Sequence, residues 1–390
     1  MYNFKTIKAG SSIGSILDRT RGIGQGFNFL RIALSLAVIF VHSYQTAYGF
    51  GIKSKWLSAG PLGPVVAATL IMFFALSGFL ITGSAIRTGN LRTFVSFRLL
   101  RLVPALFVEI VLSAFFLGIA FTTMPWQQYF GSRQFYLYFG NIVGWIHYTL
   151  PGVFHDNPVP EIVNRSLWTL HPELECYAIM SILILTSFIK NRRLLTVGWA
   201  ISVVSLTAID FFTTKLHLQG NFPGPVLVFY FLSGIVGFHW RYRVPSSRGL
   251  FIAACVSAYL LLNLAHTGFI CSIPIVYIMM YVGVTVFPKW SIIERGDYSY
   301  GMYLYGYPIQ QMIVHLLPNY REWWVVFPLA VIVSYAVAAL SWHIVEKPAL
   351  KLKKLLGGKV MQAAAPVQVA HESVAPQSAI NHFETSIRPN

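Results

Sequence analysis

Residues 62–84 read LGPVVAATLIMFFALSGFLITGS and contain no charged side chain. A helix of about 20 apolar residues is long enough to cross the ~30 Å hydrocarbon layer of a bilayer, so this stretch predicts a transmembrane helix. The composition of the whole chain agrees, since 55% of its 390 residues are hydrophobic, only 11% are charged, and the mean hydropathy is +0.60. Soluble domains carry about 25% charged residues, which excludes a soluble fold.

Nine further apolar segments of similar length predict more spans. They run at 27–47, 99–121, 168–188, 194–212, 222–240, 249–267, 270–287, 298–317 and 323–345. Residues 134–150 (QFYLYFGNIVGWIHYTL) are shorter and rich in aromatic side chains, so we expect a re-entrant or interfacial segment there. A transmembrane β-barrel would instead show short segments of alternating hydrophobicity. The sequence therefore predicts an all-α fold, a polytopic membrane helical bundle of about ten transmembrane helices plus this one segment.

The net charge of +16 fits a topology with both termini on the inner side. With that orientation, the inner segments hold 22 of the 29 Lys and Arg residues, and the outer segments hold 6. Lys and Arg are enriched in the cytoplasmic loops of multi-pass membrane proteins. The charge is thus explained by insertion in a lipid bilayer, and no nucleic acid partner is needed.

The spans divide the chain into three parts. Residues 1–26 are expected to form a cytoplasmic N-terminal segment, and residues 27–356 the membrane domain. Residues 357–390 are rich in Ala, Pro, Gln and Ser without periodicity, so we expect a disordered cytoplasmic tail there. The three cysteines lie inside apolar runs and predict small buried side chains rather than disulfides.

The first span carries two ionisable residues, Arg31 and His42. Charged groups in a membrane are unfavourable and by default mark a functional site or a buried pair. Eleven residues of helix place the two on one face, about 16 Å apart along the axis, with Arg31 near the inner boundary and His42 near the outer one. Alternatives remain open, because a topology anchor explains Arg31 alone and an interhelical hydrogen bond explains His42 alone.

Arg98 and Arg101 lie three residues apart at the inner start of another span. They share a helix face, and two guanidiniums on one face suit a phosphate group. Positive-inside anchoring is the alternative, and Glu109 on the same helix is placed to neutralise part of the charge. In 62–84, Ser77 adds a hydroxyl and Gly78 allows a ligand or a second backbone to approach closely, with helix packing the favoured explanation.

Trp168 and Glu173 begin the span at 168–188, after the outer loop 151–167. Trp168 is expected at the membrane interface. Glu173 lies five residues into the span, about 8 Å deep, which equals the depth estimated for His42. A carboxylate and an imidazole at one depth predict an oriented acid–base pair, the alternative being a solvated carboxylate at the outer edge.

Six sequence elements occur here in one order. They are Arg31-x10-His42, FFALSGFL at 73–80, Arg98-x-x-Arg101, SLWTLHPELECY at 166–177, YSYGMYLY at 298–305 and WHIVEKP at 342–348. In these elements the chain, over roughly residues 24–356, resembles the integral-membrane acyltransferase-3 family, whose members O-acylate polysaccharides, lipopolysaccharide and other envelope glycans. Many members carry a His where this chain has Gly306, so the task of that His is unassigned here. Some members have a fused soluble domain, whereas we expect this chain to act as a stand-alone membrane enzyme.

The resemblance implies an O-acetyltransferase of the bacterial inner membrane. Acetyl-CoA would be the acyl-donor cosubstrate from the cytoplasm, a glycan or glycolipid would be the acceptor on the outer face, and no metal would take part. Arg31, Arg98 and Arg101 would hold the phosphates of CoA, and Ser77, Gly78 and Phe79 would form the slot for its pantetheine arm. That arm, on the order of 15–20 Å long, is commensurate with the helical rise from Arg31 to His42.

In the same interpretation His42 and Glu173 are catalytic. His42 would act as a general base or as the nucleophile of a transient acyl-imidazole. The aromatic residues Trp168, Tyr303 and Tyr305 would contact the acceptor. The alternative function is a secondary transporter or flippase that uses the intramembrane Arg, His and Glu as a relay, although no internal repeat supports it. The sequence indicates no particular oligomeric state.

Overall fold

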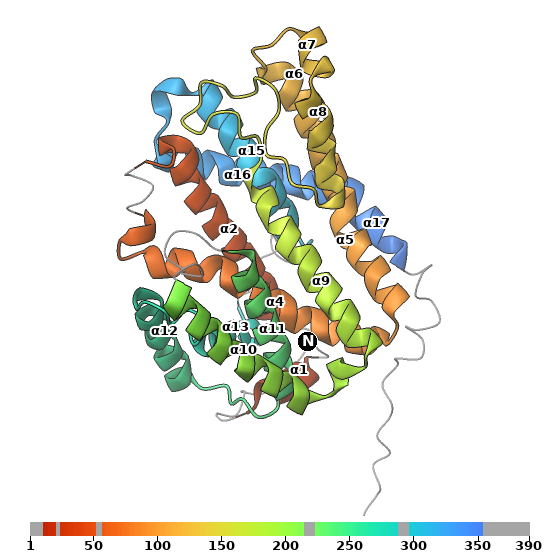
Figure 1. The fold of residues 1–390 in the computed structure, drawn as a ribbon, viewed down its shortest axis with the longest axis vertical. Coiled ribbons are helices and arrows are strands. Elements are labelled where there is room, and N and C mark those ends of the chain that lie inside the picture. Colours follow the sequence, from red (N-terminus) through yellow and green to blue (C-terminus); the bar gives the residue numbers. More distant parts are fainter. Residues whose placement is uncertain (1–10, 21–23, 52–56, 214–222, 288–295, 354–390) are drawn as a thin grey trace, which may run out of the picture.

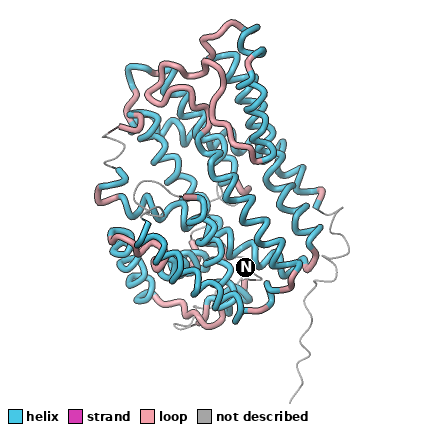
Figure 2. The backbone as a smooth tube through the Cα atoms, in the orientation of Figure 1, coloured by secondary structure: helices cyan, strands magenta, loops and turns pink. Residues whose placement is uncertain are grey.

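The computed structural model describes residues 11–20, 24–51, 57–213, 223–287 and 296–353. All regular elements in these ranges are helices, and the only β-contacts there are three isolated bridges (Figure 2). The predicted all-α fold is therefore confirmed. The expected disordered tail, 357–390, lies outside the described residues.

Each predicted span contains a helix, but the helices differ in length. Five are long and apolar enough to cross a membrane, judged by length and composition: Gly26–Tyr48, Gly63–Thr88, Leu91–Phe121, Arg192–Thr213 and Trp323–Lys351. Three apolar helices are shorter, namely α11 (Gly224–Trp240), α12 (Arg248–Asn263) and α13 (Ser272–Val284). In the remaining two predicted spans lie α9 (Leu170–Leu185) and α15 (Ser299–Leu316). A multi-helix membrane protein is thus supported, and the count of ten crossings stays a prediction.

Two hydrophobic cores hold the helices together, and α2 (Gln25–Tyr48) lies between them. Its N-terminal half adds Leu30 and Leu34 to the first core, and its C-terminal half adds Ile39 and Ala47 to the second. The first core is built mainly from α4 (Gly63–Thr88), α11 and α13, and the second from α5 (Leu91–Val111), α15 and α16 (Trp323–Ser341). Figure 1 shows α10 (Arg192–Thr213), α11, α12 and α13 gathered at one end of the molecule.

The helices α4 and α11 cross at very short distance because each supplies a glycine. A Cβ on Gly78 would lie 2.0 Å from the carbonyl oxygen of Phe231, and a Cβ on Gly234 would lie 2.0 Å from that of Ala75. Side chains at either position would push the helices apart, as at other small-residue interfaces between membrane helices. Gly78 is therefore a packing residue.

Two long helices contain π-helical segments. α5 continues through η1 (Leu112–Leu117) into α6 (Gly118–Phe121), and α16 continues through η6 (Trp342–Glu346) into α17 (Lys347–Lys351). Such bulges change the direction of the following side chains and are frequent at functional sites. In η6 the bulge ends at Glu346, whose side chain turns into the protein.

The segment predicted to be re-entrant or interfacial contains no membrane-spanning helix. It contains most of α8 (Arg133–Tyr138) and all of η2 (Phe139–Val143), followed by a loop. With α6 and α7 (Trp126–Gly131) it forms a cap at one end of the molecule (Figure 1). The short elements of the remaining chain are α1 (Ile13–Arg19), η3 (Arg165–Thr169), η4 (Phe188–Lys190) and η5 (Pro318–Tyr320).

Candidate active site

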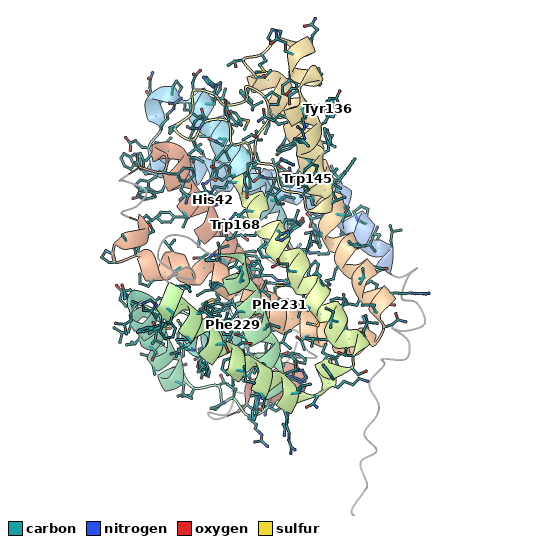
Figure 3. The ribbon with its side chains drawn as sticks, viewed as in Figure 1. His42, Tyr136, Trp145, Trp168, Phe229 and Phe231 are labelled. Carbon is teal, nitrogen blue, oxygen red and sulfur yellow. The ribbon has the colours of Figure 1, made fainter. Side chains whose placement is uncertain are left out.

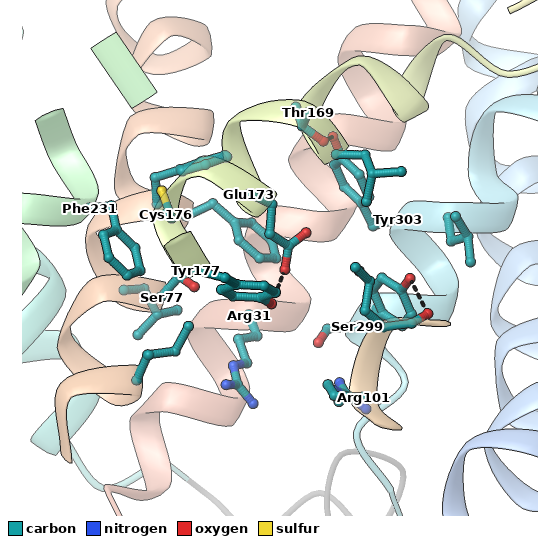
Figure 4. Close-up of a pocket in the computed structure, with 18 of the residues that line it drawn as sticks. Arg31, Ser77, Arg101, Thr169, Glu173, Cys176, Tyr177, Phe231, Ser299 and Tyr303 are labelled. Carbon is teal, nitrogen blue, oxygen red and sulfur yellow. Dashed lines mark hydrogen bonds between the residues drawn. The ribbon is translucent and has the colours of Figure 1, made fainter. Parts of the chain in front are cut away.

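A cavity of about 230 Å³ lies where the two cores meet, bordered by α2, α4, α5, α9 and α15 (Figure 4). Its apolar wall includes Leu70, Phe73 and Phe231. The polar residues that line it are Arg31, Ser77, Arg98, Arg101, Ser166, Thr169, Glu173, Tyr177, Ser299, Tyr300 and Tyr303. Six of the candidate residues, from five separate sequence elements, are therefore brought into one site.

At one end of the cavity two arginines share a carboxylate. Oδ2 of Asp297 accepts from Nη1 of Arg31 at 2.9 Å and from Nη2 of Arg101 at 2.8 Å. Nη1 of Arg101 also donates to Oε2 of Glu346 at 3.0 Å, and Glu346 is only 2% exposed. The charges of Arg31 and Arg101 are thus balanced by two carboxylates, which also fix the direction of the guanidiniums.

Asp297 is the residue at the centre of this ion cluster, and the sequence argument missed it. Burial by itself would raise the pKa of its carboxyl, but Arg101 and Arg31 outweigh burial and lower the pKa to about 2. Asp297 is therefore ionised at physiological pH. The signal that could have found it is its place directly before the YSYG element, in a chain with only 13 acidic residues.

Arg98 differs from the other two arginines because no carboxylate pairs with it among the described residues. Its guanidinium lies 5.8 Å from the centroid of the Phe94 ring, and its Nε is buried without a hydrogen-bond partner. A cation that lines a cavity without a direct ion pair attracts an anionic ligand. Of the predicted phosphate ligands, Arg98 is the one that has no carboxylate at ion-pair distance among the described residues, whereas Arg31 and Arg101 are paired.

Glu173 lies between the two ends of the cavity, where the hydroxyl of Tyr177 donates to its carboxylate (Figure 4). The positive charges of Arg101 and Arg98 also act on it. The expected hydrogen bond between Glu173 and His42 is not formed in this structure. Equal depth along the membrane normal was a poor guide, because it leaves the lateral distance between two helices undetermined.

His42 lies on the C-terminal half of α2 (Figure 3), and it does not line the cavity. Its half-buried ring meets the ring of Tyr307 edge-on, with centroids 5.0 Å apart. Tyr307 follows the cavity residue Tyr303 by four positions on α15, one helical turn or about 6 Å. His42 is thus one turn of α15 beyond the end of the cavity that Tyr303 and Thr169 form.

Of the three neighbours Ser77, Gly78 and Phe79, Ser77 alone lines the cavity. Successive residues of a helix point about 100° apart, so three in a row cannot share a face. Gly78 packs on α11, as described above, and Phe79 is 2% exposed with its ring 5.5 Å from that of Phe27. The slot expected from all three residues is therefore reduced to Ser77.

The predicted acceptor residues are separated in a similar way. Tyr303 lines the cavity, and its hydroxyl lies 2.6 Å from Oγ1 of Thr169. Tyr305 is 4% exposed and bonds to Oγ of Ser341 at 3.1 Å, away from the cavity wall. Trp168 packs against the first core. Of the three, Tyr303 alone is placed to touch a ligand in the cavity.

Asn164 and Glu109 form a buried polar network that holds the cavity wall. Nδ2 of Asn164 donates to Oε1 of Glu109 at 2.9 Å and to the carbonyl oxygen of Leu304 at 3.0 Å. That carbonyl has no helical partner, because Pro308, four residues on, lacks an N–H. Oδ1 of Asn164 in turn accepts from the backbone N–H of Ser166 at 3.0 Å. Glu109 therefore anchors the loop 151–167 through Asn164, whereas Arg101 is neutralised by Asp297 and Glu346.

Comparison with known proteins gives a direct family assignment. A sequence profile described as an acyltransferase domain, that of the acyltransferase-3 family, matches residues 25–343, most of the chain. This chain belongs to the acyltransferase-3 family. The resemblance inferred from the six sequence elements is thus confirmed, and the arginines, Glu173 and His42 all lie inside the matched region.

Several curated relatives of this acyltransferase support the assignment. Nodulation protein 10 of Rhizobium leguminosarum bv. viciae is 24% identical over 381 residues, covering 90% of this chain and 100% of that protein. An O-acetyl transferase of Shigella phage Sf6 is 25% identical and covers 82% of this chain and 94% of its own. Peptidoglycan O-acetyltransferase OatA of Listeria monocytogenes is 26% identical, with 81% of this chain aligned to 54% of OatA. No solved structure matches the chain. The protein is an O-acyltransferase with membrane-type helices.

Proposed function

We propose that this O-acyltransferase moves an acetyl group from cytoplasmic acetyl-CoA to a hydroxyl of an envelope or exported glycan, at the outer face of the bacterial inner membrane. The observation that carries the proposal is the arrangement of side chains from α2, α5 and α15. Arg98, a cation without a direct ion pair among the described residues, lines the cavity together with the inner residue Arg31, and an imidazole, His42, lies one helical turn beyond its other end.

The arginine end suits the phosphates of CoA. Arg98 supplies a charge without a direct ion pair among the described residues, while Arg31 and Arg101 present guanidiniums oriented by Asp297. Guanidiniums bind phosphate through paired donors. The cavity volume of about 230 Å³ is below the usual 300–1,000 Å³ of small-molecule pockets, so it suits the slender pantetheine arm better than a whole nucleotide.

The other end suits the reaction. A thioester carried past Phe73 and Tyr303 would come within about one helical turn of His42. The acceptor oxygen attacks the thioester carbonyl carbon as its proton passes to the imidazole of His42. The C–S bond then breaks, and the CoA thiolate leaves and takes that proton, which restores neutral His42. In the two-step route the imidazole nitrogen itself first carries the acetyl group.

The proposal is tested with the purified full-length protein in detergent, supplied with acetyl-CoA and candidate glycans. We expect free CoA thiol to appear in step with acetylated glycan, identified by mass spectrometry, without any ion gradient. A protein that consumes no acetyl-CoA with any glycan under these conditions, while folded by thermal denaturation, would contradict the proposed donor.

Lys353 adds a pH-dependent charge near the donor end. Burial, followed by the neighbouring Arg98 and Arg101, lowers the pKa of its ammonium to about 8, and its Nζ lies 5.2 Å from the Phe97 ring centroid. Lys353 is therefore mostly charged at pH 7 and mostly neutral at pH 9. We expect the affinity for acetyl-CoA to fall about two- to five-fold between pH 7 and pH 9. This is the change expected from losing one partly exposed charge interaction.

The pH effect is checked by measuring the Kd of acetyl-CoA at pH 7 and pH 9 for the wild type, Lys353→Met and Lys351→Met. Lys353→Met should bind more weakly at pH 7 and lose this pH dependence. Lys351 is exposed and serves as the matched control, which should keep the wild-type profile. An unchanged pH profile in Lys353→Met would remove Lys353 from the donor site.

A further inference from the structure

The hydroxyl of Tyr307 is buried and has no hydrogen-bond partner among the residues that the structure describes. The side chain is 0% exposed. A buried polar group without a partner costs about 1–3 kcal/mol, so such groups are rare in folded proteins unless they serve a function. The position of this one, against the ring of His42, indicates which function.

The surroundings of Tyr307 favour a negative charge. The charge of Arg165 acts on both His42 and Tyr307. Arg165 is half-buried, its guanidinium lies 4.2 Å from the centroid of the Phe50 ring, and no carboxylate pairs with it in the described part of the chain. An O–H donor beside a cation without a counter-ion is a suitable environment for an oxyanion that forms during a reaction.

The two rings are held in place by bonds between their helices. Nε2 of Gln310 on α15 donates to the carbonyl oxygen of Ile39 at 2.6 Å and to Oγ of Ser43 at 2.7 Å, both on α2. These contacts lie within about one helical turn of His42 and of Tyr307. The hydroxyl is therefore preorganised relative to the imidazole, as electrostatic stabilisation of a transition state requires.

Other tyrosines near the site do not share this combination. The hydroxyl of Tyr303 lies 2.6 Å from Oγ1 of Thr169 and donates to the carbonyl oxygen of Ser166 at 3.3 Å. Tyr138 also has a buried hydroxyl, but it lies on α8, where Ser113 and Glu109 are its polar neighbours. Tyr307 thus combines an uncommitted hydroxyl with contact to His42.

We propose that Tyr307 is a further catalytic residue, whose hydroxyl donates a hydrogen bond to the carbonyl oxygen of the acyl thioester as that oxygen becomes negative. The inference rests on the proposed function. The acceptor oxygen forms its bond to the carbonyl carbon, its proton goes to His42, and the electron pair of the C=O bond moves to the oxygen facing Tyr307. When the pair returns, the C–S bond breaks, and the thiolate takes the proton from His42.

Tyr307→Phe tests the proposal because it removes one oxygen atom and keeps the ring contact with His42. We expect kcat for acetyl transfer to fall about 10²–10³-fold, as for loss of one oxyanion donor. The Kd of acetyl-CoA should stay unchanged, and the thermal unfolding temperature should stay equal or rise, since an unpaired buried hydroxyl is lost. Tyr138→Phe is the matched control and should keep wild-type kcat.

A second measurement reports the hydrogen bond directly. Acetyl-CoA labelled with ¹³C at its carbonyl is bound to His42→Ala protein, so that it is not consumed, and its C=O stretch is recorded by infrared difference spectroscopy. The C=O stretch should lie at a lower frequency than that of a thioester in an aprotic solvent, where no hydrogen bond forms. In the double variant His42→Ala/Tyr307→Phe it should return to a higher frequency. A purely structural role for Tyr307 would not produce this shift.

The outcomes separate the two proposals. Wild-type kcat in Tyr307→Phe, or an equal loss in Tyr138→Phe, would overturn the role of Tyr307 while acetyl transfer by the wild type upholds the proposed function. Failure of the wild-type protein to transfer acetyl, or full activity in His42→Ala, would overturn both.

Discussion

Replacing His42 with alanine is expected to lower the rate of acetyl transfer by at least ~10²–10⁴-fold, the usual contribution of a general acid–base group. Loss would be complete if the imidazole carries the acetyl group covalently. Donor affinity should persist, because Arg98 and Arg101 line the cavity whereas His42 lies outside its wall. Initial rates of acetylation and the Kd of acetyl-CoA are measured on the same preparation.

His315→Ala is a suitable control for His42→Ala. His315 is another half-buried histidine, near the C-terminal end of α15, and its ring contacts those of Phe121 and Phe154. It should change stability but not turnover per folded molecule. Activity retained in His42→Ala would contradict every route proposed for this enzyme, since each passes a proton or the acetyl group through that imidazole.

Glu173 has a different expected role from the one that its depth suggested. No hydrogen bond joins it to His42, and its carboxylate accepts from Tyr177 within reach of the arginine charges. We therefore place Glu173 among the groups that set the charge of the cavity, rather than in a hydrogen-bonded pair with the base.

The sequence predicted the helices well because the membrane imposes a simple rule on them. Each apolar run that is long enough to span the bilayer contains a helix in the structure, beginning with the run at 62–84. The face of a residue also follows from one helix alone, and Arg31, Arg98 and Arg101, expected to act together, line one cavity in the structure. The sequence elements of the family added Glu173 and Tyr303 to the candidate site residues.

Contacts between helices could not be read from the sequence in the same way. Periodicity gives the face of a residue, but the neighbour of that face depends on how all the helices pack. Asp297 and Asn164 were missed for this reason, although Asp297 holds the arginines and Asn164 holds the loop 151–167. The same limit explains why Gly78 was wrongly expected at the cavity. Its small size allows α4 and α11 to cross closely, and Ser77 lines the cavity instead.

Arg101→Ala is expected to destabilise the protein as well as weaken donor binding. Arg101 bonds to Asp297 and Glu346, and Glu346 is 2% exposed, so removal of Arg101 leaves a buried carboxylate without its cation. Breaking a buried ion pair from one side costs about 3–5 kcal/mol of folding free energy. Thermal unfolding in detergent should show a lowered Tm, with partial recovery in Arg101→Lys, which restores one charge but not the paired donors.

Arg98→Ala is the matched comparison, because Arg98 has no ion pair to break among the described residues. Its loss should leave Tm near the wild-type value and weaken acetyl-CoA binding by about 1.5–3 kcal/mol, the range for a hydrogen bond to a charged group. The two variants thus differ in stability while both bind the donor more weakly. Unchanged donor affinity in Arg98→Ala would assign that arginine to membrane topology. An equal drop in Tm in both variants would mean that Arg98, like Arg101, is held by a counter-ion, one outside the ion cluster around Asp297.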